Sequence, residues 1–395
     1  MIDPGVRELL DLMVRWIHVI AGIMWIGNSL LFNWLDRNLQ QPREGAELGR
    51  IWLIHSGGFY HVEKTLLSGQ GLPAPMHWFK WQAYTTWLTG ALLLGIVYYS
   101  AGGALLINPS ARGLSVPGAI ALSAGLIALA WPVYDLLWRS PLGRARISGF
   151  FALAAIVAIA FALTRVFSAR AAFLHMGALL GTLMAGNVAM LIMPSQRQLV
   201  ASIAAGHGID RALADRAKAR SIHNNYLVFP VIALMLSAHF PGIYGHRYAW
   251  GLVGVLVVAG AGVRHFMNIR FTEPRWRWGL AATAAAALAV LYFATATPGT
   301  ARSDLTAGAE APTFADVRSI IDRRCSACHS AQPADRTFGA APGGVSFDSP
   351  DQIRVFADRI LNRAVTTRTM PPANKTSITE TERQTLRRWI ENGAQ

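Results

Sequence analysis

Long apolar runs, each about the length of a membrane-spanning helix, recur along the chain up to residue 297. A helix needs about 20 mostly apolar residues to cross a hydrocarbon layer about 30 Å thick. Only helices or closed barrels satisfy their backbone in lipid, and these runs lack the period of two that is typical of barrel strands. The pattern predicts eight transmembrane helices, at 9–35, 82–106, 115–138, 147–167, 172–194, 222–240, 248–267 and 277–297.

The pattern changes after residue 297. Residues 298–313 are rich in Pro, Gly, Ala, Ser and Thr and predict a flexible linker. Helical periodicity then returns in three short segments, 314–324, 350–364 and 378–392. We therefore expect an all-α protein with a transmembrane domain (1–297), a linker (298–313) and a small C-terminal domain (314–395). A core that small needs a large cofactor to help fill it.

The charge distribution supports the membrane interpretation. Only 15% of residues are charged, against about 25% in soluble domains. The net charge of +14 could suggest nucleic acid, but most basic residues sit in short loops beside apolar runs, so we expect a lipid bilayer and no nucleic acid. Lysine and arginine number 17 on one side and 6 on the other. The richer side, with loops 36–80, 139–146, 195–221 and 264–277, should be cytoplasmic in a bacterial inner membrane, which puts both termini in the periplasm.

The C-terminal segment contains a heme-attachment motif. Cys325-Ser326-Ala327-Cys328-His329 matches C-x-x-C-H, in which two thiols bind the vinyl groups of heme c and the histidine binds iron. Met370 is the only methionine after the motif and is the expected second axial ligand, as in small class I-like cytochromes c. A zinc half-site or a redox pair is the alternative. Zinc needs further ligands, and the segment offers no other Cys or His.

Ionisable residues at membrane depth form two layers and are candidates for function. In the outer layer, His18 and His175 could hold a heme b, or could simply form hydrogen bonds between helices. The inner layer suits a planar anionic ligand, because guanidinium groups pair bidentately with such ligands. The alternative is a set of snorkelling arginines and helix-end caps. The inner layer comprises Asp135, His223, Asn224, Asn225, Arg264, His265, Asn268 and Arg270.

Four segments resemble the bacterial membrane-bound urate oxidases, and the resemblance extends over nearly the whole chain. They are HSGGFYHVEK (55–64), LPAPMHWFKWQAY (72–84), VYDLLWRSP (133–141) and SIHNNYLVFPVIALMLSAHFP (221–241). Members of that family join an eight-helix domain to a cytochrome c domain. The resemblance implies oxidation of urate to 5-hydroxyisourate, with electrons passing to the cytochrome and then to a respiratory cytochrome or terminal oxidase. No peroxide would form.

Roles for individual membrane residues are predicted from their chemistry. Lys64 or His55 could act as general base on urate or water. The purine would be oriented and its charge stabilised by residues of the inner layer, namely His223, Asn224, Asn225, Arg264 and His265. Two other functions fit the same features. One is a diheme quinol:cytochrome c electron-transfer protein without urate chemistry, and the other is a non-enzymatic heme-binding membrane protein.

Overall fold

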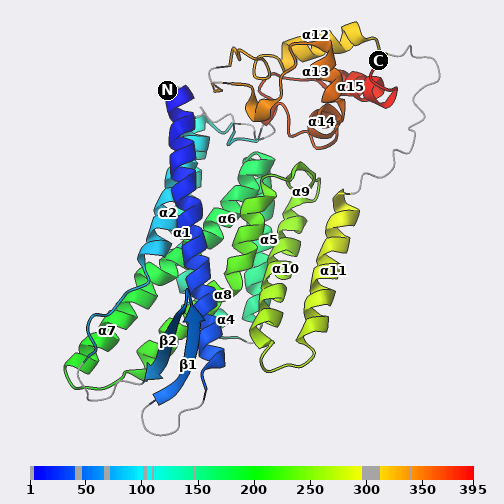
Figure 1. Cartoon of the computed structure of the whole chain (residues 1–395). Helices are drawn as coiled ribbons and strands as arrows, with labels where there is room; N and C mark the ends of the chain where they lie inside the picture. The colour runs from blue at the N-terminus through cyan, green and yellow to red at the C-terminus, as the bar shows by residue number, and fades with distance from the viewer. Residues whose placement is uncertain are drawn as a thin grey trace.

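Helices make up most of the computed structural model (Figure 1), which describes residues 4–40, 47–65, 72–100, 105–108, 111, 113–145, 147–295, 312–335, 337–338 and 340–395. The longer helices of the first part are α1 (Pro4–Asn38), α2 (Trp81–Leu94), α3 (Val116–Arg139), α5 (Ser148–Val166), α6 (Ala169–Gly186), α7 (Met193–Ala204), α8 (Arg211–Ser237), α10 (Ala249–Ile269) and α11 (Trp276–Thr295). Between them lie the short helices α4 (Pro141–Arg144) and α9 (Pro241–Tyr244) and two π-helical segments, η1 (Gly95–Tyr99) and η2 (Asn187–Ile192).

Within the described residues, six helical stretches are long and apolar enough to cross a membrane: α1, α3, α5, the continuous Ala169–Ala204, α10 and α11. The expected spans 82–106 and 222–240 are not among them. In the first, α2 passes into η1, which ends at Tyr99, and residues 101–104 lie outside the described residues. In the second, polar residues at 223–225 interrupt the apolar run of α8. The helical fold is confirmed, and eight spans stay a prediction.

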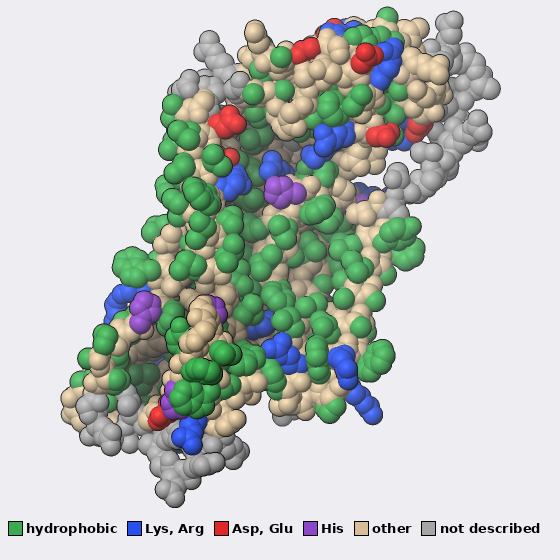
Figure 2. Space-filling model, viewed as in Figure 1, with side chains coloured by type: hydrophobic (Ala, Val, Ile, Leu, Met, Phe, Trp, Pro, Cys, Tyr) green, Lys and Arg blue, Asp and Glu red, His purple; other side chains and the backbone are tan. Residues whose placement is uncertain are grey.

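The bundle is organised around α6, which contacts α3, α5 and α8. On one side α10 packs against α8, α5 and α11, and on the other α1 pairs with α2, which reaches α6. Most residues of α6 are buried, whereas α11 has no buried residue, as expected for a helix that faces lipid. Figure 2 shows hydrophobic side chains along the flank of the bundle, with charged ones gathered toward its two ends.

A β-hairpin makes the all-α prediction wrong in one place. Strands β1 (Glu47–His55) and β2 (Gly58–Thr65) pair antiparallel and lie at the end of the bundle opposite the C-terminal domain (Figure 1). Their two-residue turn, Ser56-Gly57, has positive φ at both positions (51° and 77°), as a type I′ turn requires. The strands are rich in aromatic and β-branched residues, and this short signal is hidden between long helices.

The predicted loop 195–221 is also mostly helical. From Ala169 the chain stays helical through η2 and α7 to Ala204, and α8 begins at Arg211. Asp210 caps α8 by accepting hydrogen bonds from the amides of Ala212 and Leu213. The segment RALADRAKAR is charged, but alanine, arginine and lysine are strong helix formers, so it extends α8 beyond the apolar run.

The C-terminal segment has its own apolar core. It contains α12 (Phe314–Arg324), α13 (Pro350–Val355), α14 (Ala357–Ile360) and α15 (Glu380–Glu391), with short turns η3 (Pro342–Gly344), η4 (Leu361–Thr366) and η5 (Pro372–Asn374). Helices α12 and α15 pack together, with the rings of Phe314 and Trp389 5.9 Å apart. Of the predicted linker 298–313, residues 298–311 lie outside the described residues.

Glu382 of α15 binds Arg324 of α12 and makes the stability of the C-terminal segment depend on pH. It accepts hydrogen bonds from Arg324 Nε (3.0 Å) and the Thr379 amide (2.8 Å). Burial alone would raise the pKa of Glu382, but these bonds hold it below its usual value. The ionised form therefore stabilises the fold above the unfolded-state pKa of about 4.3, and this stabilisation is lost as the pH falls through the folded-state pKa.

We expect Glu382→Gln to destabilise the C-terminal segment by about 1 kcal/mol at neutral pH and by much less in acid. Hydrogen exchange of α12 and α15 in the full-length protein measures this, compared with wild type at each pH. Glu391→Gln is the control, because Glu391 makes only an i,i+4 ion pair with Arg387 within α15. Equal destabilisation at neutral and acid pH would contradict the assignment.

Candidate functional site

Seven polar and aromatic side chains meet where α3, η2 and α8 pack near α4. We call them the inner polar cluster: Trp131, Tyr134, Asp135, Asn187, Arg220, His223 and Asn224. Three come from α3 and three from α8, and each trio has the i, i+3, i+4 spacing that places side chains on one helix face. The seventh, Asn187, begins η2, and π-helical segments are frequent at functional sites.

Asn187 is the hub of the cluster. It is completely buried, accepts a hydrogen bond from Trp131 Nε1 (3.1 Å) and donates to Asn224 Oδ1 (2.9 Å) and Tyr134 Oη (3.2 Å). Tyr134 Oη lies 2.5 Å from His223 Nδ1. We assign the tyrosine proton to this contact, since the tyrosine oxygen already accepts from Asn187. With this assignment His223 accepts at Nδ1, carries its own proton on Nε2 and is a hydrogen-bond donor there.

The charged members form a buried ion pair beside this network. Asp135 Oδ1 lies 2.8 Å from Arg220 Nη2, and its Oδ2 lies 2.7 Å from Arg139 Nη2. The Arg220 guanidinium also lies over the Tyr134 ring, 4.9 Å from its centroid. Arg220 and Asp135 are buried, whereas the Arg139 side chain is 65% exposed. The buried pair therefore fixes α8 against α3 at the cluster.

An open cavity of about 570 Å³ adjoins the cluster. Its walls are formed by Asp135, Trp138, Arg139, Gly143, Arg144, Leu191, Arg216, Ala219, Arg220 and His223. Four arginines face a single acid here, so the cavity favours an anion. The Trp138 ring lies 4.4 Å from the His223 ring and offers an apolar face for a flat ligand. The volume lies in the range usual for small-molecule sites.

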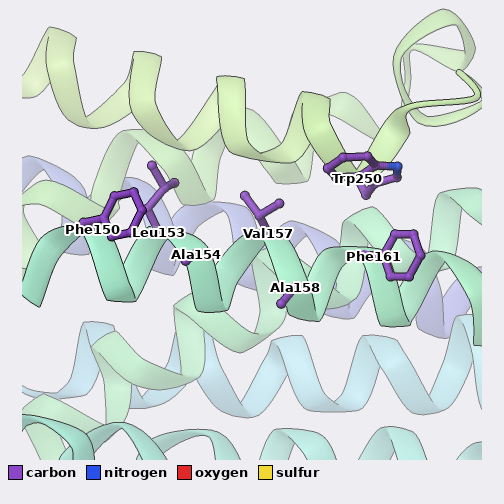
Figure 3. Close-up of a pocket in the computed structure, with 7 residues that line it drawn as sticks. All are labelled: Phe150, Leu153, Ala154, Val157, Ala158, Phe161 and Trp250. Carbon is purple, nitrogen blue, oxygen red and sulfur yellow. The ribbon is translucent and has the colours of Figure 1, made fainter. Parts of the chain in front are cut away.

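A second hollow, of about 520 Å³, lies between α5 and α10 (Figure 3). It is lined by Phe150, Leu153, Ala154, Val157, Ala158, Phe161 and Trp250. All of these side chains are apolar except for the indole N–H. The hollow has no group that could transfer a proton or pair with an anion, and it suits lipid chains on the flank of the bundle.

Gly186 allows the close approach of α6 to α3 that brings Asn187 into the cluster. A Cβ built on Gly186 would lie 2.3 Å from two ring carbons of Trp131. We expect Gly186→Ala to destabilise the protein by about 1–3 kcal/mol and to weaken ligand binding in the cavity, because overpacking displaces Trp131. Thermal unfolding in detergent measures the first effect. Gly181→Ala on the same helix is the control, because it meets nothing within 4 Å and should not destabilise. Equal stabilities would contradict this role of Gly186.

The remaining predicted inner residues form a separate group between α8 and α10. Asn225 Oδ1 accepts from Arg264 Nε (3.0 Å) and Asn268 Nδ2 (2.8 Å), and all three residues are buried. Arg264 Nη2 and Asn268 Oδ1 have no hydrogen-bond partner. His265 is exposed and its Nδ1 lies 2.9 Å from Tyr226 Oη. Asn224 and Asn225, adjacent in the sequence, thus belong to two different groups.

The structure does not bring the predicted bases together with His223 or Arg264. His55 lies beside the hairpin turn, is exposed, and its Nδ1 contacts Ser56 Oγ (2.9 Å). Lys64 lies at the other end of the hairpin, pairs with Gly49, and forms an ion pair with Asp36 of α1 (2.6 Å). With a rise of about 3.3 Å per residue along β1, His55 and Lys64 are roughly 20 Å apart. At most one of them can therefore act at a given reaction centre, and the role of either as general base stays a prediction.

The two outer histidines form hydrogen bonds, as the alternative to a heme b expects. His175 is completely buried, donates from Nδ1 to the Ala171 carbonyl (2.7 Å) and accepts at Nε2 from the Ser123 hydroxyl, 2.6 Å away. His18 Nδ1 contacts the Thr86 carbonyl (2.9 Å) and Thr89 Oγ1 (3.0 Å), which leaves its Nε2 lone pair for another partner. A heme b held by His18 and His175 stays a prediction.

The C-x-x-C-H segment does fit heme c. His329 Nδ1 donates to the Val345 carbonyl (2.8 Å), which fixes the tautomer and leaves the Nε2 lone pair for iron. Cys325 packs at the edge of the apolar core, and both thiols are free. Burial raises the pKa of the Cys325 thiol to about 12 and that of Cys328 to about 11. Neither has the lowered pKa of a reactive redox pair.

Met370 is held firmly by its backbone. Its amide donates to the Arg363 carbonyl (2.9 Å), and its carbonyl accepts from Arg383 Nη1 (3.1 Å). Arg383 Nη1 also donates to the Ala364 carbonyl. These bonds place the methionine in a fixed loop, as an axial ligand to iron requires. Among the described residues, no group of three or more His, Cys, Asp or Glu could hold a metal ion.

The sequence-based prediction omits the residues that complete the inner polar cluster, above all Tyr134, Asn187 and Arg220. A signal for them exists. Arg220 precedes His223 by three positions on one helix, so the two share a face, and Tyr134 adjoins Asp135, which stands at membrane depth. Asn187 carries no such signal, because its role depends on η2 and on the approach allowed by Gly186.

A family model described as urate oxidase N-terminal matches residues 4–296. The chain belongs to this family. The match includes every element from α1 to α11, and therefore the inner polar cluster and its cavity, and it supports a urate-related oxidoreductase. Helices α12 to α15 lie beyond the matched residues. No curated protein and no solved structure matches the chain significantly.

Proposed function

We propose that the chain is an eight-span membrane urate oxidase that converts urate to 5-hydroxyisourate and passes the electrons to heme c in its C-terminal domain. In this reaction urate and one water yield 5-hydroxyisourate, two protons and two electrons. The hydroxyl on the product comes from water, and oxygen is reduced elsewhere in the respiratory chain, so no peroxide is released. The arginine-lined cavity beside the inner polar cluster carries this proposal, together with the family match.

Each wall of the cavity suits one property of urate. The anion pairs with arginine, for which Arg144, Arg216 and Arg220 are available, and the flat ring lies against Trp138. His223 donates from Nε2 to a urate oxygen and stabilises the negative charge there. Tyr134 and Asn187 hold that tautomer in place. The released protons pass to water, because the cavity is open.

In the C-terminal domain, Cys325 and Cys328 would bind the porphyrin, and His329 and Met370 would bind its iron. When bound, heme c accepts one electron at a time. The family match does not extend to this domain, so the support is the C-x-x-C-H motif, the His329 tautomer and the fixed Met370 loop. Both chain ends lie at the end of the molecule opposite the hairpin (Figure 1), as a periplasmic cytochrome would need.

Anaerobic addition of urate to the purified protein, followed by recording of the heme bands, tests the function. We expect reduction of heme c without oxygen, and absence of reduction would refute the proposal. A quinol is the control reductant. Reduction by quinol but not by urate would favour a quinol oxidoreductase. A pyridine hemochrome spectrum shows whether any heme besides heme c is present.

A further inference from the structure

The C-terminal domain touches the bundle at the residues that precede Met370. Arg363 Nη1 donates to Tyr244 Oη in α9, 3.2 Å away. The next residue, Gly245, is equally close: a Cβ built there would lie 2.7 Å from Thr367 Cβ and 3.0 Å from Thr369 Cγ2. We call residues 363–369 the docking loop. Any side chain at position 245 would push this loop away.

Tyr244 connects the docking loop to the interior of the bundle. It is only 3% exposed and belongs to the same buried apolar cluster as Tyr98 of η1. The Tyr98 ring in turn lies 6.1 Å from the ring of His175 in α6. Buried aromatic side chains thus extend from the surface on which the docking loop rests to His175 of the outer layer.

Arg363 joins this surface to the expected iron ligand. Its side chain donates to Tyr244, and its carbonyl accepts from the Met370 amide at 2.9 Å. On the other side, Arg383 binds the Met370 carbonyl. A single residue therefore contacts both the bundle and the backbone of the methionine.

We propose that Tyr244 and the docking loop form the port through which electrons pass from the bundle to heme c. This inference rests on the proposed function. Bound heme c would take up one electron per transfer and pass it on to the respiratory chain before the next, so the two electrons of one urate would leave in two transfers, while the two protons go to the water of the cavity. Arg363 and Gly245 are positioning residues: the first binds the loop to Tyr244, and the second leaves room for it.

The first test measures the rate of heme c reduction by urate without oxygen. Tyr244→Phe removes only the oxygen that accepts from Arg363, and loss of a hydrogen bond to a charged group should lower the docked population and the rate by about tenfold. Arg363→Gln should do the same. Direct reduction of heme c by ascorbate, the methionine–iron charge-transfer band and the KM for urate should not change in Tyr244→Phe.

Arg368→Gln is the matched control. Arg368 lies in the same loop and carries the same charge, but it pairs with Glu380 of its own domain (2.9 Å). We expect a wild-type rate. An unchanged rate in Tyr244→Phe and Arg363→Gln, or an equal loss in Arg368→Gln, would overturn the port. Purified protein without covalent heme would instead refute the proposed function.

Hydrogen exchange provides a readout besides activity. Any side chain at position 245 displaces the docking loop, so Gly245→Ala should speed the exchange of the amides of residues 363–369 in the full-length protein. We expect reduction of heme c by urate to slow as well, with reduction by ascorbate unchanged. Gly251→Ala is the control, because a Cβ at Gly251 meets nothing within 4 Å. Wild-type exchange and a wild-type rate in Gly245→Ala would overturn the proposal.

Discussion

Replacing Cys325 and Cys328 together by serine is expected to abolish both covalent heme and urate-dependent oxygen consumption. The thioether bonds need both sulfurs, and without them only the coordinate bonds from His329 and Met370 would hold the heme. Removal of the sole proposed electron acceptor in the chain should lower turnover to the background, a loss of about a thousandfold or more on the scale of typical enzyme rates. Heme staining of denatured protein and oxygen uptake by membranes measure the two effects.

Ser326→Ala provides the control within the motif. Ser326 lies between the cysteines, and its hydroxyl contacts only the Ile321 carbonyl (3.3 Å) and Asp322 (3.4 Å) of its own domain. Heme content and turnover should stay near wild type. If the double serine variant kept its turnover, electrons would leave by another route and the C-terminal domain would have no part in the reaction.

Arg220→Gln is expected to be among the most destabilising substitutions in the bundle, at about 3–5 kcal/mol, because it leaves the buried Asp135 carboxylate without its buried partner. Arg220 also lines the cavity, so urate binding should weaken by about tenfold or more, as for the loss of one charge-assisted hydrogen bond. Thermal unfolding in detergent and isothermal titration with urate measure the two effects separately.

Two further variants at the ion pairs of Asp135 serve as controls. Arg139→Gln removes the exposed partner, and we expect less than about 1 kcal/mol. The double variant Asp135→Asn with Arg220→Gln removes both buried charges and should regain part of the stability lost in Arg220→Gln, although not the urate affinity. If the double variant loses as much unfolding free energy as Asp135→Asn and Arg220→Gln lose in sum, or more, the two residues do not act as a pair.

Helices whose whole length is apolar could be predicted from the sequence with good bounds. The segments 115–138 and 248–267 correspond to Val116–Arg139 and Ala249–Ile269. The hairpin could not, because its strands are short and the turn Ser56-Gly57 is a weak signal beside long helices. Helix α7 was hidden for a different reason: its polar composition is typical of a loop, while its stability comes from packing on α8.

The site shows a sharper limit. Polar residues at membrane depth are visible in the sequence, and Asp135, His223 and Asn224 indeed meet in one cluster. The sequence does not show which adjacent residues also belong to the cluster, because each step along a helix rotates the side chain by about 100° about the helix axis. Asn225 therefore faces α10 and bonds to Arg264 of that helix, whereas Asn224 faces the inner polar cluster. Because the two asparagines are adjacent in the sequence, the sequence alone does not show that they belong to different groups.

The continuous helix from Ala169 to Ala204 has a consequence for how the substrate arrives. Thirty-six helical residues span about 54 Å, whereas the hydrocarbon layer is only about 30 Å thick, so in a bilayer we expect α7 to extend into the aqueous phase. We expect the cavity, whose wall includes Leu191 two residues before α7, to open at the depth of the lipid phosphates. A leaflet potential of about −30 mV would deplete a monovalent anion there roughly threefold. The arginines that line the cavity would offset that depletion by raising the local concentration of urate, although the negative membrane surface lowers it.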